Sequence, residues 1–150
     1  LFDGERGEHR LWRACRDAAP WAPETVREVL GARRGPLLSQ DAFLAIEVWT
    51  ECELAALHAL HRLARLAPDA TDAAAIRSRS AEAIHWHLEH TQPDNATNRP
   101  WALHVFARGG DPESTLYAET LLHNVTASDA RHEPLSRWIL LDCVRELTAG

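Results

Sequence analysis

The segment from Asp41 to Ala67 most constrains the fold, because it predicts one long helix that is apolar around roughly half of its circumference. At about 100° per residue, one broad face collects the apolar side chains. These are Val48, Trp49, Cys52, Ala56, Ala59, Leu60, Leu63 and Leu66. Such a helix is expected to be buried on a wide face.

Proline and capping residues divide the rest of the chain into further helices. One is expected to be capped by Thr71 or Asp72 and to run to about His90. Two more should begin at Asp111 and Pro134, because an acid before proline, or proline in the first turn, suits a helix start. The last helix is expected to turn a set of mostly apolar residues towards the core: Ile139, Leu140, Cys143, Val144 and Leu147.

The N-terminal part is predicted to form a helical arm over residues 1–38, followed by a main helical domain over 39–150. A first helix is expected from about Glu5 to Ala18, and a short second one from Pro23 to Leu30. Glycine and proline in the segment Gly35–Leu38 mark the boundary.

The fold class predicted is all-α, since no segment shows sustained strand alternation. We expect an antiparallel array of about six or seven helices. This succession of helix pairs is similar in architecture to an α-solenoid or to part of an α/α-toroid. The core is expected at Trp49, Leu60, Leu63, Ile84, Trp101, Leu122 and Leu140.

Composition narrows the classes of function. The net charge of −6 argues against a nucleic-acid partner, because neutralising phosphates requires a basic face. No apolar run approaches the roughly 18 residues of a membrane-spanning helix, so a soluble, cytoplasmic protein without membrane insertion is expected. The chain contains no methionine, and we expect it to be a fragment of a longer reading frame.

The three cysteines, Cys15, Cys52 and Cys143, are far apart and fall within helical patterns. Buried free thiols are therefore expected rather than a disulfide.

The segment Glu82–Arg108 holds four of the nine histidines and two of the six tryptophans, and a polar connector runs through its middle from Thr91 to Pro100. Two hypotheses fit this connector. Its side chains either satisfy a sharp helix reversal, with Asn98 capping a helix that starts at Pro100, or bind a polar ligand. Helical periodicity turns His87 inward. The ligand hypothesis takes His87, Asp94, Asn95, Asn98, Arg99, Trp101 and His104 as the site.

A second polar group lies on the long helix, on the strip that holds Glu47, Glu51, His58 and His61. We expect this strip to face solvent or to form ion pairs, and we expect no cofactor. The alternative is a site for a divalent transition metal, since carboxylates and imidazoles at helical spacing are typical ligands.

Two classes of function therefore stand. The first is an all-helical scaffold or protein-interaction module, as part of a larger helical-repeat protein, that binds a protein partner or the remainder of its own chain. The alternative is an enzyme or small-molecule-binding domain with a histidine, aspartate and asparagine site around residues 87–104, in which a metal could assist.

Overall fold

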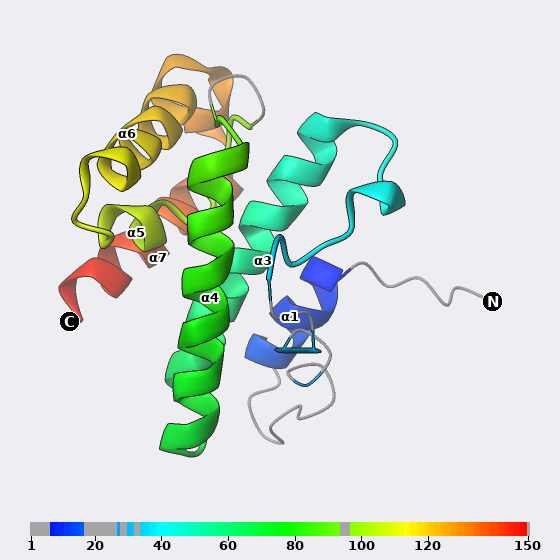
Figure 1. Cartoon of the computed structure of the whole chain (residues 1–150). Coiled ribbons are helices and arrows are strands. Elements are labelled where there is room, and N and C mark those ends of the chain that lie inside the picture. The colour runs from blue at the N-terminus through cyan, green and yellow to red at the C-terminus, as the bar shows by residue number, and fades with distance from the viewer. Residues whose placement is uncertain (1–6, 17–26, 28–29, 32–33, 94–96, 150) are drawn as a thin grey trace.

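The computed structural model describes residues 7–16, 27, 30–31, 34–93 and 97–149, and every regular element within these ranges is a helix (Figure 1). The all-α prediction is confirmed. None of the helices in these ranges is long and apolar enough to cross a membrane. The elements are α1 (Gly7–Arg16), the 3-10 turn η1 (Gln40–Ala42), α3 (Ile46–Leu66), α4 (Ala70–His90), α5 (Leu103–Ala107), α6 (Pro112–Ala127), the 3-10 turn η2 (Asp129–His132) and α7 (Pro134–Thr148).

Helix α3 lies at the centre of the molecule. Its neighbour α4 runs beside it, α1 packs on one side of this pair, and α5, α6 and α7 gather on the other side (Figure 1). Thirteen of the 21 residues of α3 are buried, which is more than one face of a helix can supply. The helix is therefore enclosed by its neighbours.

Two hydrophobic clusters share α3 between them. One joins α3 to the C-terminal helices and contains Leu54, Leu57, Trp101, Phe106, Leu121 and Ile139, among others. The other joins α3 to α1 and α4 and contains Leu11, Cys15, Ala59, Leu60, Leu63 and Ile76, among others. Because α3 contributes to both, the position of every other helix is set by its contact with α3 or with a helix that packs on α3.

Local signals account for the starts of α4, α6 and α7. Asp111 caps α6, where its Oδ1 accepts a hydrogen bond from the Ser114 N–H at 2.8 Å, and α7 begins at Pro134 as predicted. The predicted cap of α4 is wrong. Asp69 caps this helix instead, because its Oδ1 accepts from the Asp72 N–H at 2.8 Å.

The expected core is largely right, with one error. Trp49, Leu60, Leu63 and Trp101 are buried, and Ile84 and Leu140 are half-buried. Leu122 is wrong: it is 45% exposed, because α6 turns its neighbour Leu121 inward instead.

In the N-terminal half, one predicted boundary changes. The long helix begins at Ile46 rather than Asp41, since η1 precedes it. The first N-terminal helix is present as α1, and its Leu11 is buried against α3. The short helix predicted from Pro23 to Leu30 falls mostly outside the described residues.

Leu63 and Leu122 give a matched test of this core. Leu63 is 1% exposed, so Leu63→Ala should lower the free energy of unfolding by about 2–5 kcal/mol through lost burial and the cavity left behind. Leu122→Ala, at the half-exposed position, should change it by no more than about 0.5 kcal/mol. Urea unfolding measures both, and equal losses would contradict the assignment of Leu63 to the core.

Candidate functional site

The first candidate residue, His87, is fully buried on α4, as its predicted inward direction requires. Its Nε2 lies 3.3 Å from Glu53 Oε1 and its Nδ1 lies 3.0 Å from Thr91 Oγ1. Thr91 Oγ1 in turn is 2.8 Å from the Tyr117 hydroxyl. Both ring nitrogens of His87 are thus engaged inside the protein.

Glu53 is the buried carboxylate at the centre of this network, and the sequence hypotheses did not include it. Its two oxygens accept hydrogen bonds from the Leu37 and Leu38 N–H groups at 2.6 and 2.7 Å. Trp49 Nε1 donates to the Leu38 carbonyl at 3.1 Å. These contacts tie the segment before α3 to α3 itself, which makes the network a structural element of the fold.

The connector contains Asp94 and Asn95, which lie outside the described residues. Asn98 does not cap a helix: it is exposed, and α5 starts only at Leu103. Thr97 is the buried residue here, and its Oγ1 accepts from the Arg99 N–H at 3.2 Å. The predicted role of Asn98 is therefore wrong, because the chain makes a turn before the helix begins.

Asn124 on α6 holds the connector in place. Its Nδ2 donates to the carbonyls of Pro93 and Thr97, at 2.6 and 3.1 Å. The sequence carries only a weak signal for this role, namely a single asparagine between the buried residues Leu121 and Val125.

A surface pocket of about 650 Å³ lies beside the connector. Arg99 borders it and pairs with Glu51 and, at 3.0 Å, with Glu133. Glu47 also lines the pocket, so Glu47 and Glu51 lie near Arg99, whereas His58 and His61 contact α5 and α7. The structure does not bring these four residues of the metal alternative into one group.

His58 is fully buried and lies against Asp142, so the solvent-facing half of the prediction for its strip is wrong. Its Nδ1 accepts a hydrogen bond from the Ala102 N–H at 3.2 Å. A backbone N–H can only donate, so Nε2 must carry the ring proton and donate it to Asp142 Oδ2 at 3.0 Å. Ala102 takes a left-handed conformation, with φ of 57°, at the point where its N–H meets this ring.

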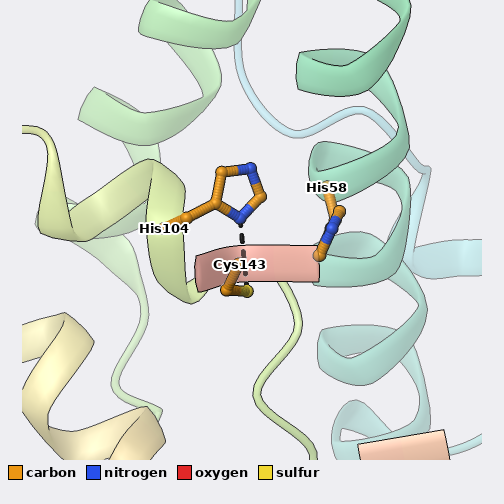
Figure 2. A group of neighbouring side chains, drawn as sticks. All are labelled: His58, His104 and Cys143. Atoms are coloured by element: carbon orange, nitrogen blue, oxygen red, sulfur yellow. Dashed lines mark hydrogen bonds between the residues drawn. The ribbon is translucent and has the colours of Figure 1, made fainter. Parts of the chain in front are cut away.

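His104, on α5, is also fully buried and lies beside His58, with ring centroids 4.5 Å apart. Figure 2 shows its Nδ1 directed at Cys143 Sγ, at 3.3 Å. Its Nε2 lies 3.2 Å from His61 Nδ1. Burial lowers the pKa of His104 to about 2, and it also lowers the pKa of His61, so both rings are neutral near pH 7.

Two acids of α7 face this group of histidines. Arg62 Nη1 donates to Asp142 Oδ1 at 2.7 Å, and Arg65 Nη1 donates to Glu146 Oε1 at 2.5 Å. The hydrogen bond from His58, together with Arg62, lowers the pKa of Asp142 to about 2. Asp142 and Glu146 are one helical turn apart and were missed, although an acid pair within an apolar helix is the signal that could have found them.

The described cysteines are buried thiols outside any disulfide, as predicted. Burial raises the pKa of Cys15 to about 12 and that of Cys143 to about 11. Both are therefore protonated thiols near neutral pH, and neither is a nucleophilic thiolate.

The direction of α7 differs from the prediction. Asp142 and Glu146 point inward, whereas Val144 and Leu147, expected in the core, are 58% and 40% exposed. Opposite the buried side lies what we term the α7 outer face, which consists of Arg137, Trp138, Leu141, Val144 and Arg145. Both sides of this helix thus carry apolar residues.

No protein-family model, curated protein or solved structure matches the chain. A function is therefore inferred from the chemistry of its own residues.

Asp142→Asn tests the buried pair with His58. The substitution should lower the free energy of unfolding by about 1–3 kcal/mol at pH 7, because it removes a charged acceptor from buried donors. The pKa of Asp142 falls from 3.8 in the unfolded chain to about 2 in the fold, so its stabilisation is complete above the unfolded value and is lost as pH falls through the folded one. Urea unfolding at a series of pH values should show the wild-type advantage shrinking between pH 4 and about 2. A difference in unfolding free energy between the wild type and Asp142→Asn that stays constant with pH would contradict this pairing. Glu119→Gln, on the exposed side of α6, is the control and should show no such pH dependence.

Asn124→Ala tests the connector. Loss of its two buried hydrogen bonds leaves the Pro93 and Thr97 carbonyls without this donor and should lower the free energy of unfolding by about 1–3 kcal/mol. The exposed Asn98 is the matched control, and Asn98→Ala should change stability by no more than about 0.5 kcal/mol. Thermal or urea unfolding of the pair measures this, and the reverse order of effects would restore Asn98 as the capping residue.

Proposed function

We propose that this chain is a protein-interaction module that binds an acidic, amphipathic helix of a partner protein on the α7 outer face. The observation that carries the proposal is the exposure of three large apolar side chains on one side of α7: Trp138 is 43%, Leu141 55% and Val144 58% exposed. Contiguous apolar surface of this kind is typical of interaction sites.

The helix itself supports this assignment. Its inward side already buries Ile139 and Cys143 against the core. A helix that carries apolar residues around most of its circumference is normally covered on both sides. In this fold the Trp12 ring of α1 packs edge-on against Trp138 at one edge of the outer side, with ring centroids 5.5 Å apart, whereas Leu141 and Val144 stay more than half exposed. A partner is the natural source of cover for these two residues.

The charges around the face define the partner. Arg137 and Arg145 lie four residues on either side of Leu141 and therefore share its side of the helix. The acids of α7 nearest to them, Asp142 and Glu146, face inward, where they contact His58, Arg62 and Arg65. The outer face is thus basic within a chain of net charge −6, and it favours acidic flanks on the bound helix.

A small pocket of about 280 Å³ lies beside Arg145. Its lining combines Arg62 and Arg65 with the acids Asp142 and Glu146, to which these two arginines donate hydrogen bonds. A carboxylate from the partner can pair with the Arg145 guanidinium group at this edge. Tryptophan and arginine are also the residue types that most often dominate binding free energy at interfaces.

The alternative function, a ligand site over residues 87–104, receives less support. His87 contacts Thr91 and Glu53 through its two ring nitrogens, and Trp101 is buried against Trp12 and His58. These two candidate ligands are therefore used in packing and hydrogen bonding of the fold.

The experiment uses a labelled helical peptide with leucines at i, i+3, i+4 and i+7 and glutamates on the flanks. Fluorescence polarisation should show that it binds the wild-type chain, and that the same peptide with lysine flanks does not. Leu141→Glu should weaken binding at least tenfold, about 1.4 kcal/mol, because it places a charge at the centre of the face. Arg145→Glu should reverse the preference towards the lysine peptide.

Leu116→Glu is the control, since Leu116 is 64% exposed on α6, away from this face. Equal binding of both peptides, or an equal loss in Leu116→Glu, would contradict the proposal. Sedimentation of the chain alone measures whether it forms a dimer. A dimer that Leu141→Glu dissociates would assign the α7 outer face to a second copy of the chain instead.

A further inference from the structure

The group of polar residues between α3, α5 and α7 contains one atom that the fold leaves unsatisfied. Glu146 is 4% exposed, and its Oε2 is buried without a hydrogen-bond partner among the described residues. Its other oxygen, Oε1, is held by Arg65 at 2.5 Å. A buried carboxylate oxygen without a partner is destabilising, so its surroundings indicate what would satisfy it.

Two imidazole nitrogens lie beside this oxygen. His61 Nδ1 is 3.8 Å from Glu146 Oε2 and 3.2 Å from His104 Nε2. All three atoms lie within 4.8 Å of one another. Two histidines and a glutamate are a ligand set that zinc takes in proteins.

We propose that His61, His104 and Glu146 form a binding site for a divalent transition metal ion such as Zn²⁺. Ligand atoms around tetrahedral zinc, at metal distances of about 2.0–2.2 Å, are separated from each other by about 3.4 Å. Two of the three separations, 3.2 and 3.8 Å, bracket this value, and the third is within 4.8 Å, so a movement on the order of 1 Å brings all three atoms onto the ion.

The neighbours of His104 orient it for this role. Cys143 Sγ lies 3.8 Å from the Pro100 carbonyl, to which its S–H is directed. The sulfur can then accept the His104 Nδ1–H at 3.3 Å, which leaves a lone pair on Nε2 towards His61 and Glu146. A ligand histidine whose other nitrogen donates to a fixed acceptor is the usual arrangement in metal sites.

Protonation also favours binding. Metal ions require neutral imidazoles, and burial already lowers the pKa of both histidines. Arg65 and Arg108 bring positive charge to Glu146, through a side-chain pair and through its backbone carbonyl. We expect this charge to weaken the site relative to a zinc site without such neighbours.

A second group of metal-ligand residues shares His104 and consists of His58, His104 and Cys143, all buried (Figure 2). It is the weaker candidate. Both nitrogens of His58 already have partners, the Ala102 N–H and Asp142. Cys143 would also have to lose a proton from a thiol whose pKa is raised to about 11. Cys143 is therefore assigned as a positioning residue for His104.

Access to the proposed site is available from solvent. The His61 side chain is 19% exposed, and Glu146 lines the small pocket that Arg62 and Arg65 border. Three protein ligands with an open side leave the fourth position of a tetrahedral ion to water.

Titration of the metal-free chain with Co²⁺ and Zn²⁺ tests the site. Cobalt should give the intense visible absorption of tetrahedral coordination, without the near-ultraviolet band of a thiolate ligand, at one ion per chain. Zn²⁺ should displace it and raise the Tm of the chain. His61→Gln and Glu146→Gln should each weaken zinc binding at least tenfold, measured by calorimetry, while circular dichroism reports whether each variant is folded.

His90→Gln is the matched control, because His90 is exposed and stacks on Trp86 away from the site. It should bind zinc as the wild type does. The proposal is overturned if the wild type gives no tetrahedral cobalt spectrum, or if His90→Gln loses binding as His61→Gln does. A thiolate band that Cys143→Ser removes would assign the ion to His58, His104 and Cys143 instead. Unchanged affinity in both His61→Gln and Glu146→Gln would likewise overturn it.

Discussion

The structure depends on two polar side chains carried by the fully buried middle turns of α3. Glu53 and His58 are both fully buried on α3, and a buried charge or imidazole destabilises the fold unless other groups meet it. Glu53 accepts hydrogen bonds from the N–H groups of Leu37 and Leu38. His58 accepts one from the Ala102 N–H and donates one to Asp142. These contacts fix where the segment before α3, the turn before α5 and helix α7 must lie. A purely apolar α3 would permit several packings of similar free energy, whereas these partners favour one.

Helix existence and helix starts were predictable because their signals are local. Asp111 followed by Pro112 and the proline at 134 act through backbone groups within one turn, so no knowledge of the rest of the fold is needed. The free thiols followed from spacing, and the inward direction of His87 followed from helical periodicity. The cap of α4 was missed by two or three residues. Asp69, Thr71 and Asp72 all carry a side-chain oxygen that can accept a hydrogen bond from a first-turn N–H, so the residue type alone does not distinguish them.

The polar sites were not predictable in the same way, since their partners are distant in sequence. His58 and Asp142 are 84 residues apart, and Asn124 meets the connector from 27 and 31 residues away. Periodicity alone places a histidine and an aspartate on the polar side of their helices. Periodicity predicts the wrong direction when two such residues form a hydrogen bond with each other. The pair can then be buried, whereas either residue alone could not. This is why the burial of His58 was not predicted and why Val144 and Leu147 were expected in the core.

The orientation of α7 links the two proposals physically. Turning Val144 and Leu147 inward would bury apolar surface worth about 1.5–3 kcal/mol for each side chain. It would also remove Asp142 and Glu146 from His58, Arg62 and Arg65, and so leave a buried imidazole without its acceptor. The observed direction satisfies the polar group and leaves the apolar residues at the surface with Arg137 and Arg145. A partner helix on the outer face would recover the apolar burial, and an ion on the inner side would satisfy the remaining oxygen of Glu146. The two events use opposite sides of one helix, so substitutions at Leu141 and at His61 should affect them separately.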